Sequence, residues 1–448
     1  MDSVKKIAIL GSTGSIGQQA LGVICALSAR FRVIGLAGGK NLRLLEKQIA
    51  KFQPEMFYAS VEPDFTYRGE FLSMEQIASH PDVDLVIIAT SGKAGLYPTL
   101  AALKAGKTVA LANKEVLVMA GEIITNVIAN PSPPAILTLN KFQGKNLGMG
   151  LRVNSVKQSY QAQILPIDSE LSAIWQCLQG EGNKPKRIFL TASGGPFYHY
   201  SQPELRKVTV EQALQHPTWK MGSKITIDSA TLLNKGLEAI EAHWLFAIPF
   251  ESIEILIHPQ SIIHSMVEFM DSSIKAQLSF PDMRLPIQYA LCYPERLLNS
   301  ELPRLNWSKI KSLNFEPVEQ NRFPCLKLAL DAGKQGGTYP AVLCAADEVA
   351  VGLFLNKRIS FTDIARIVQE TLEQHRGIAQ PSLEEILVAD AWAREYVERL
   401  FICYGKACPA PKPFASCHSE GAKRPKNLAQ AKLREGEGTR RSDLRSVR

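Results

Sequence analysis

Short apolar runs alternate with longer amphipathic segments along the first 130 residues. Runs dense in Ile, Val, Leu and Ala predict strands, and segments with an apolar residue every three or four positions predict helices. The expected strands are 6–10, 31–37, 83–90 and 108–112, and the expected helices are 18–28, 41–52, 96–107 and 115–129. Strands that alternate with helices at this spacing are typical of a parallel, doubly wound sheet. We therefore expect an α/β protein whose residues 1–130 form a Rossmann-like domain.

The alternation stops after residue 130. Residues 131–163 contain clustered Pro and Gly and no sustained periodicity, so we interpret them as a poorly ordered insertion or loop. Strand and helix patterns then resume and predict a central α/β catalytic domain over 164–298, in which 216–246 is expected to form a loop, a strand and a helix. Helical patterns dominate 299–403, which predicts a C-terminal helical domain.

The net charge of +8 comes almost entirely from the end of the chain. Residues 404–448 carry five Lys and six Arg against three Glu and one Asp, and they are rich in Pro, Gly and Ser. We expect a disordered, passive basic tail, with an RNA-binding arm as the alternative, and no nucleic-acid partner for the folded body. Deleting this tail is expected to leave activity unchanged.

The lengths of the apolar runs and the spacing of the cysteines indicate in which cellular compartment the protein is expected. No apolar run reaches the roughly 18 residues that suggest a membrane span. The eight cysteines contain no CxxC pair and no spacing typical of a metal site. We therefore expect a cytoplasmic protein with reduced thiols and no membrane contact.

Two glycine-containing turns indicate a dinucleotide site. The sequence GSTGSIG at 11–17 joins the first strand to the first helix, where glycine lets the backbone approach a pyrophosphate at the helix N-terminus. The second strand is followed by AGGKN at 37–41, without the acidic residue that holds the ribose diol of NAD. A cation at this point favours the 2′-phosphate of NADP, and a solvated Lys40 is the alternative.

Acidic residues follow the apolar run at 164–167. Asp168 and Glu170 flank Ser169, and residues i and i+2 of a strand point to one face, so we expect their carboxylates to converge. Two like charges held together require a positive partner. Glu238, on a predicted helix, supplies a third carboxylate, and oxygen ligands without Cys or His favour Mg²⁺ or Mn²⁺.

Polar residues also gather in two other motifs. LANKE at 111–115 follows a predicted strand, at the edge of the sheet where ligands bind. In DSATLLNKGLE at 228–238, Asn234, Lys235 and Glu238 share one helix face, and with Ser229 they make a plausible phosphate clamp. A solvated Lys–Glu pair is the alternative for the helix. Trp219, in the loop HPTWKMG, fits either a lid over a substrate or a core anchor.

Taken together, these motifs resemble the 1-deoxy-D-xylulose 5-phosphate reductoisomerase family. The resemblance rests on GSTGSIG, AGGKN, LANKE, PIDSE, SGGPF, HPTWKMG, DSATLLNKGLE and IHPQSIIHSMV, in this order. It covers about residues 5–403 apart from roughly 131–160, where this chain has additional residues that we expect to form a surface excursion away from the site. The basic tail matches nothing in the family pattern.

The resemblance implies a residue-by-residue site. NADPH contacts fall on Thr13, Gly14, Ser15, Ile16, Gly39, Lys40, Asn41, Asn113, Glu115 and Gly222. Metal ligands fall on Asp168, Glu170 and Glu238. Substrate contacts fall on Lys114, Ser169, Glu170, Ser193, His216, Ser229, Asn234, Lys235 and Glu238. The residues expected to be catalytic are Asp168, Glu170, Glu238, His216 and Lys114, and Trp219 matches the aromatic residue of the family's mobile loop.

The resemblance also implies a reaction. The family converts 1-deoxy-D-xylulose 5-phosphate, a small phosphorylated sugar, to 2-C-methyl-D-erythritol 4-phosphate for isoprenoid synthesis. A metal-assisted rearrangement of the carbon skeleton is followed by hydride reduction with NADPH, and family members are homodimers. Two alternatives are a different NADP-dependent dehydrogenase and a catalytically silent NADP-binding protein whose site is disrupted by the insertion at 131–163.

Overall fold

The N-terminal part of the chain forms a seven-stranded parallel sheet. The computed structural model describes residues 4–61, 67–130, 163–219, 221–319 and 321–403. The strand order is β4 (Glu70–Phe71), β3 (Met56–Ala59), β2 (Phe31–Gly38), β1 (Lys5–Leu10), β5 (Leu85–Ile88), β6 (Thr108–Leu111) and β7 (Gln163–Pro166). Every neighbouring pair in the sheet is parallel. The predicted Rossmann-like sheet is confirmed, and its order reverses direction between β1 and β5.

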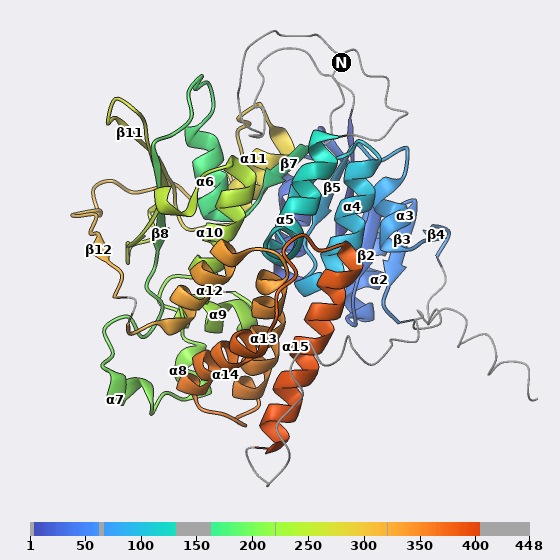
Figure 1. The fold of residues 1–448 in the computed structure, drawn as a ribbon. Helices are drawn as coiled ribbons and strands as arrows, with labels where there is room; N and C mark the ends of the chain where they lie inside the picture. The colour runs from blue at the N-terminus through green and yellow to red at the C-terminus, as the bar shows by residue number, and fades with distance from the viewer. Residues whose placement is uncertain (1–3, 62–66, 131–162, 220, 320, 404–448) are drawn as a thin grey trace, which may run out of the picture.

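Helices cover both faces of this sheet (Figure 1). They are α1 (Ser15–Ala26), α2 (Leu42–Phe52), α3 (Met74–Ser79), the 3-10 turn η1 (Gly92–Gly95), α4 (Leu96–Lys104) and α5 (Lys114–Ala129). Alternate residues of β1 pack into different cores: Ile7 and Ile9 pack on the side of α1, and Ala8 and Leu10 on the side of α4 and α5. Strands buried on both faces explain why the apolar runs are continuous.

A second, mixed sheet of five strands follows along the chain. Its order is β11 (Ile274–Leu278), β10 (Ile263–Glu268), β8 (Arg187–Ala192), β9 (Ile253–Ile257) and β12 (Glu316–Pro317). The helices of this region are α6 (Ser169–Cys177), α7 (Gln202–Leu205), α8 (Val210–Ala213), α9 (Ser223–Ala230), α10 (Leu233–Phe246), the 3-10 turn η2 (Phe250–Ser252) and α11 (Arg284–Cys292). In Figure 1 this sheet lies on the opposite side of the view from the first sheet.

Four helices complete the described chain. They are α12 (Pro324–Gln335), α13 (Tyr339–Leu355), α14 (Phe361–Gln374) and α15 (Leu383–Cys403), as the sequence predicts. Helix α13 packs against α12, α14 and α15 and also against α5 of the first domain. No helix among the described residues is long and apolar enough to cross a membrane.

The local structure differs from the sequence prediction just ahead of Ser229. The strand expected ahead of Ser229 is the helix α9. Ile and Thr in KITID favour a strand locally, but Lys224 and Asp228 pair across one helical turn, and Thr226 and Ile227 are buried by the tertiary fold.

The division into domains stays a prediction. Strand β7, which lies in the predicted central domain, pairs with β6 and forms the edge of the first sheet, so the sheet extends past the predicted boundary at residue 164. The predicted insertion lies outside the described residues except for Gln163, which begins β7. The predicted disordered tail at 404–448 also lies outside them.

Candidate active site

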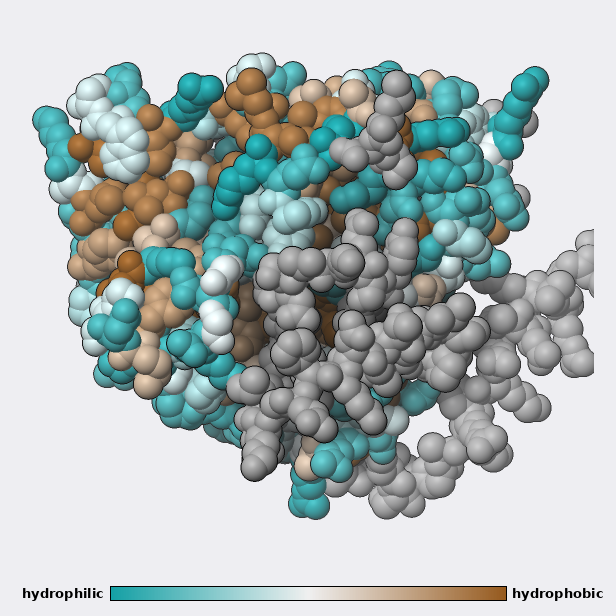
Figure 2. Space-filling view, turned by 90° about the horizontal axis from the view of Figure 1, so that it is seen from above, coloured by the Kyte–Doolittle hydropathy of each residue, from teal (hydrophilic) through white to brown (hydrophobic). Residues whose placement is uncertain are grey.

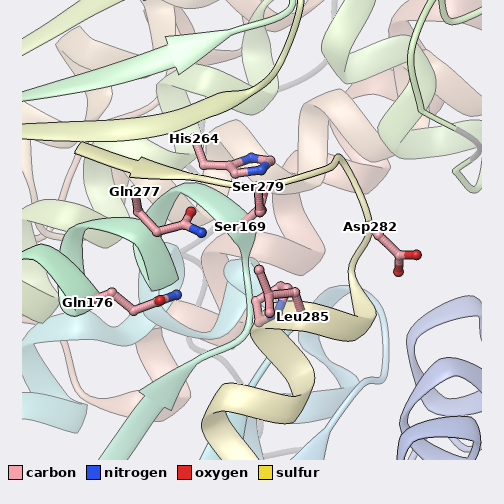
Figure 3. A pocket seen from close by; sticks show the side chains of 8 residues that line it. Ser169, Gln176, His264, Gln277, Ser279, Asp282 and Leu285 are labelled. Atoms are coloured by element: carbon pink, nitrogen blue, oxygen red, sulfur yellow. The ribbon is translucent and has the colours of Figure 1, made fainter. Parts of the chain in front are cut away.

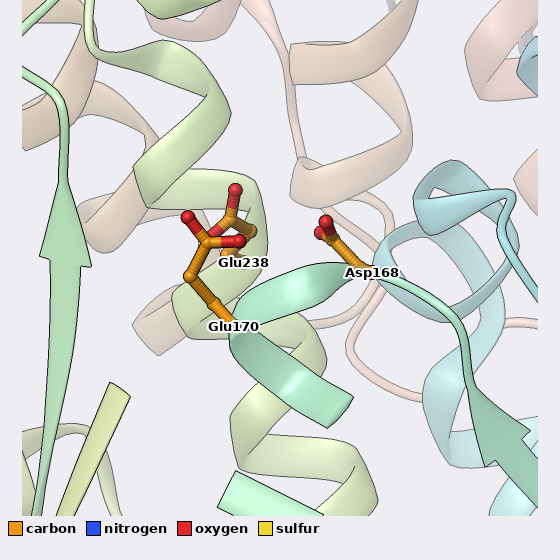
Figure 4. A group of neighbouring side chains, drawn as sticks. All are labelled: Asp168, Glu170 and Glu238. Atoms are coloured by element: carbon orange, nitrogen blue, oxygen red, sulfur yellow. The ribbon is translucent and has the colours of Figure 1, made fainter. Parts of the chain in front are cut away.

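Three carboxylates from two helices meet at one point. Asp168 is the N-cap of α6, Glu170 lies in its first turn, and Glu238 lies on α10. One oxygen of each carboxylate lies within 4.8 Å of the others, and Figure 4 shows the three side chains gathered around a common space. The predicted cluster therefore exists as a group of neighbouring side chains, and its role as a metal site stays a prediction.

The first two acids reach this point by a local structure that differs from the expected one. Strand β7 ends at Pro166 and α6 begins at Ser169, so Asp168 and Glu170 start a helix and do not lie on a strand. The last bond of this strand to β6 is the one from the Ile167 N–H to the Leu111 carbonyl oxygen, at 2.9 Å. Asp is a preferred N-cap residue, and Asp168 Oδ1 accepts a hydrogen bond from the Ser169 N–H at 3.0 Å. The strand prediction was wrong for these acids, although their convergence was right.

Two buried lysines balance part of the negative charge. Lys114, the first residue of α5, donates from Nζ to Asp168 Oδ2 at 2.7 Å and lies 3.8 Å from Glu238 Oε1. Lys235 donates to Glu170 Oε1 at 2.8 Å and to Glu238 Oε2 at 2.6 Å. Three carboxylates thus face two ammonium groups, which leaves the cluster attractive to a further cation.

The electrostatics of the cluster follow from burial and charge. Burial alone would raise the pKa of Glu170, but the Lys235 ammonium outweighs it and lowers the pKa to about 2. Burial and then the charge of Glu170 raise the pKa of Glu238 to about 8. Burial would lower the pKa of Lys114, but Asp168 and Glu238 outweigh it and raise the pKa. Burial and the charge of Glu170 therefore oppose ionisation of Glu238, and a bound cation would favour it.

Hydrogen bonds from two polar side chains complete this end of the site. Asn234 Nδ2 donates to Glu238 Oε1 at 2.5 Å, and Ser169 Oγ donates to Glu170. Asn234 Oδ1 is buried and has no hydrogen-bond partner among the described residues. It is an open acceptor next to the carboxylates, suited to a hydroxyl group of a ligand.

A second cluster consists of two serines around one histidine. His216 Nε2 lies 2.9 Å from Ser193 Oγ and 3.1 Å from Ser229 Oγ. Ser193 follows β8, and the next two residues, Gly194 and Gly195, have φ values of +85° and +68°. A Cβ atom on Gly195 would lie 2.8 Å from the Ser229 carbonyl oxygen. The SGG turn therefore needs glycine to bring the end of β8 against α9.

The tautomer of His216 follows from its hydrogen bonds. Nδ1 accepts from the backbone N–H groups of Thr218 at 3.1 Å and Trp219 at 2.9 Å, so it carries no proton. A neutral ring must then hold its proton on Nε2. Burial lowers the pKa of His216 to about 4, which keeps the ring neutral near pH 7. His216 is thus a neutral Nε2–H donor whose other nitrogen holds the backbone that leads to Trp219.

The glycine turn after β1 lies at the point where the strand order of the first sheet reverses. Open α/β sheets bind ligands at such a switch point. Gly14 is the N-cap of α1 and has no side chain with which to cap the helix, so the amide groups that follow are open to an anion. The turn needs its glycines, because a Cβ atom on Gly11 would lie 2.4 Å from the Ala89 carbonyl oxygen. Thr13, Ser15 and Ile16 belong to the same turn.

Cationic side chains follow β2. Gly39 and Lys40 lie between β2 and α2, and Asn41 is the N-cap of α2. A Cβ atom on Gly39 would meet no atom within 4 Å, so its backbone is open. A surface pocket here is lined by Asn41, Arg43, Leu44 and Lys47. The positive charge predicted for a 2′-phosphate is therefore present on both sides of Asn41.

Three more predicted cofactor residues lie on other elements. Asn113 is 2% exposed, and its amide donates to the carbonyl oxygens of Thr90 at 2.9 Å and Gly92 at 2.8 Å. Because this amide is occupied in joining two turns of the sheet, we expect any cofactor contact to come from the backbone of Asn113. Glu115 lies in the first turn of α5, and Gly222 is the N-cap of α9.

The sequence reasoning did not single out His264. This residue lies on β10, is 5% exposed and packs against Trp219, with ring centroids 6.1 Å apart. Together with Ser169 it lines a small pocket near the start of α6 (Figure 3). The only signal was its place in the motif IHPQSIIHSMV. Its neighbours come from distant segments, so spacing alone gave it no role.

Comparison with known proteins identifies the family. The profile described as 1-deoxy-D-xylulose 5-phosphate reductoisomerase matches residues 7–121, and two profiles for C-terminal domains of the same enzyme match 164–246 and 278–396. The 1-deoxy-D-xylulose 5-phosphate reductoisomerase of Pelotomaculum thermopropionicum is 48% identical over 405 residues, which cover 87% of this chain and 97% of that protein. The chain belongs to the 1-deoxy-D-xylulose 5-phosphate reductoisomerase family.

Other reductoisomerases agree with this result. The enzyme of Desulforamulus reducens is 46% identical over 89% of this chain and 99% of its own length. The solved structure from Zymomonas mobilis in complex with NADPH is 38% identical, with a TM-score of 0.75 over 89% of this chain and 99% of that one. A reductoisomerase with NADPH, fosmidomycin and magnesium is 35% identical, with a TM-score of 0.78 over 90% of this chain and 100% of that one. The predicted family, fold class and enzymatic activity are confirmed.

Proposed function

We propose that this chain converts 1-deoxy-D-xylulose 5-phosphate to 2-C-methyl-D-erythritol 4-phosphate with the two clusters described above. In this proposal the substrate's oxygen-bearing carbons lie at Asp168, Glu170 and Glu238. The substrate's phosphate lies toward Ser193, His216 and Ser229. The observation that carries this proposal is the convergence of three carboxylates, two lysines and a serine–histidine group in a member of this family.

The residues present fit a divalent cation. The candidate ligands are three carboxylates with no sulfur or nitrogen donor, which suits Mg²⁺ or Mn²⁺. A solved relative is described as holding magnesium. Such a cation, when bound, polarises the substrate's oxygens and stabilises the charge that develops on them. Lys235, which bridges Glu170 and Glu238 here, is then free to turn toward the substrate.

The chain's own residues bind and orient the sugar phosphate. Asn234 Oδ1 and Lys114 offer an acceptor and a donor beside the carboxylates. The neutral His216 donates from Nε2 to the phosphate together with the serine hydroxyls. Anchoring the phosphate away from the reacting carbons fixes the orientation of the rest of the molecule, and this orientation lowers the barrier of the rearrangement. Trp219 packs on His264 above this region and excludes water.

The first sheet fits NADPH. The turn with Thr13, Gly14, Ser15 and Ile16 presents backbone N–H groups at the start of α1, and solved relatives are described as complexes with NADPH. The cofactor supplies the hydride that reduces the aldehyde formed by the rearrangement. Gly39, Lys40 and Asn41 contact the 2′-phosphate in this proposal, while Asn113, Glu115 and Gly222 lie toward the rest of the cofactor.

Replacement of Lys40 tests the position of the 2′-phosphate. Lys40→Ser removes one charged hydrogen bond, worth roughly 1.5–3 kcal/mol, so we expect NADPH affinity to fall by about 10- to 100-fold. The weak affinity for NADH, which lacks the 2′-phosphate, should change less than about 2-fold, and both are measured by fluorescence titration. Equal losses for the two nucleotides would show that Lys40 acts on the fold and not on the phosphate.

The product identifies the reaction. Purified chain is incubated with 1-deoxy-D-xylulose 5-phosphate, NADPH and Mn²⁺, and the product is analysed by NMR. We expect the branched carbon skeleton of 2-C-methyl-D-erythritol 4-phosphate. An unbranched reduced sugar phosphate would instead indicate an ordinary dehydrogenase. The alternative of a silent NADP-binding protein is not favoured, because the described residues include every predicted site residue.

We also propose that two copies of the chain associate through the second sheet. Strand β11 is an edge strand, and Met270, Ile274 and Phe280 around it are 72%, 53% and 45% exposed. Apolar surface gathers on the side of this sheet (Figure 2). Sedimentation should give a dimer, and Ile274→Lys should shift it toward monomer; a wild-type monomer at micromolar concentration would refute the proposal. A cytoplasmic location stays a prediction.

A further inference from the structure

A second buried group of charges lies next to the candidate site. Lys224 Nζ lies 2.6 Å from Asp228 Oδ2 and 2.9 Å from Asp347 Oδ2, and it is 3.9 Å from Glu115 Oε1. Asp347 is fully buried and Asp228 is 2% exposed. Oδ1 of Asp228 and both carboxylate oxygens of Asp347 have no hydrogen-bond partner among the described residues, so Asp347 is joined to Lys224 as an ion pair. Neither the sequence motifs nor the proposed reaction gives Lys224, Asp228 or Asp347 a role.

Lys224, Asp228 and Asp347 connect helices that position residues of the candidate site. Lys224 and Asp228 lie on α9, which begins after Gly222 and carries Ser229 directly after Asp228. Asp347 lies in the middle of α13, in the C-terminal helical region. The ion pair of Lys224 with Asp347 therefore joins α13 to the helix that places Ser229 beside His216.

The group contains more acidic side chains than its one lysine can neutralise. Two aspartates share a single lysine, and Glu115 adds further negative charge at 3.9 Å. Burial, and next the neighbouring Asp347, raise the pKa of Asp228 well above its usual range. Burial also raises the pKa of Asp347, against the opposing effect of Lys224. Both shifts favour the protonated form, because two buried carboxyls that face a single lysine repel each other when both are ionised.

We propose that Asp347 is a positioning residue for the substrate's phosphate, acting through Lys224 and Asp228 on the orientation of α9 and so on Ser229. This inference rests on the proposed placement of the phosphate at Ser229. Asparagine at position 347 has the same shape, and its amide oxygen still faces Lys224, while it carries no charge that repels Asp228. Alanine removes the tie between α13 and α9.

The test compares Asp347→Ala with Asp347→Asn in the full-length enzyme. A misplacement of about 1 Å can cost about 100-fold, so we expect Asp347→Ala to raise the KM for the sugar phosphate by about 100-fold. Its kcat should also fall, because a loosely held phosphate orients the reacting carbons less well, whereas its Kd for NADPH should stay within about 3-fold of wild type; Asp347→Asn should stay within about 3-fold in every parameter. Thr371→Val, which removes a buried hydroxyl that bonds to the Ile367 carbonyl oxygen on α14, is the matched stability control.

The outcomes separate positioning from packing. If Asp347→Ala lowers thermal stability as Thr371→Val does but leaves the KM for the sugar phosphate unchanged, the proposal is wrong. Equal impairment of the Ala and Asn variants also overturns it, because the amide should restore the link. If Asp347→Ala does not fold, the same measurement is made on Lys224→Met, because Lys224 is the partly exposed partner of Asp347. A raised KM for the sugar phosphate is expected, and an unchanged KM would contradict the proposal. An inactive wild-type enzyme would instead refute the proposed function.

Discussion

Glu238→Gln is expected to abolish turnover while leaving NADPH binding nearly intact. Glu238 is 1% exposed, and its two oxygens accept hydrogen bonds from Asn234 and Lys235. It also lies next to the carboxylates of Asp168 and Glu170. A neutral amide in its place removes one of three anionic ligands and puts an N–H group against a cation. Loss of groups that merely orient metal ligands costs 10- to 100-fold, so loss of a ligand should lower kcat by about 100-fold or more.

A matched control separates this effect from general damage. Glu268→Gln changes a buried glutamate on β10 that pairs with Lys186 and Arg187, and it should leave kcat within about 2-fold because surface-linked ion pairs contribute little. The dissociation constant of NADPH is measured for both variants by fluorescence. Loss of NADPH binding in Glu238→Gln would contradict the separation of the cofactor site from the carboxylate site.

His216 variants should divide the two functions of its ring. Asparagine places an acceptor near the position of Nδ1 and keeps the hydrogen bonds from the Thr218 and Trp219 backbone. Glutamine places a donor near the position of Nε2. A hydrogen bond to a charged group contributes about 1.5–3 kcal/mol, so His216→Asn should raise the KM for the sugar phosphate by about 10- to 100-fold. His216→Gln should mainly lower kcat, because the Trp219 backbone loses its anchor.

His216→Ala removes both functions and should be more impaired than either mimic. His80→Asn is the control, since Nδ1 of this surface histidine also accepts from a backbone N–H, that of Asp82, and its variant should match wild type. Neutral Nε2–H imidazole at position 216 is measured independently by its 15N chemical shifts at pH 7. A protonated ring, or an alanine variant with unchanged KM and kcat, would contradict the role given to this residue.

The sequence was sufficient for elements whose signal is local. The strand–glycine turn–helix unit at Lys5–Ala26 and the four C-terminal helices follow from periodicity and from the need for glycine at the turn. The two acids of PIDSE show the limit of that reasoning. An apolar run before Asp168 suggested that the strand continued, whereas Asp at an N-cap position was the available sign that a helix begins.

Other features depend on contacts between distant residues. The helix at Ser223–Ala230 contains residues that favour a strand, and its structure is decided by burial and by Lys224. Asp347 meets Lys224 from a helix far along the chain, and no spacing rule connects them. The tautomer of His216 required the positions of backbone N–H groups. The residues of the site could therefore be predicted from motifs. The contacts that position their side chains could not, because they join residues far apart in the sequence.

The central claim is that a divalent cation bound by Asp168, Glu170 and Glu238 is required for the rearrangement that precedes reduction. It is tested most directly by the absorbance of NADPH at 340 nm in a mixture of metal-stripped enzyme and 1-deoxy-D-xylulose 5-phosphate. We expect no loss of absorbance until Mn²⁺ is added, and then oxidation of one NADPH per sugar phosphate. Oxidation at an equal rate without metal, or none after Mn²⁺ is added, would contradict the claim.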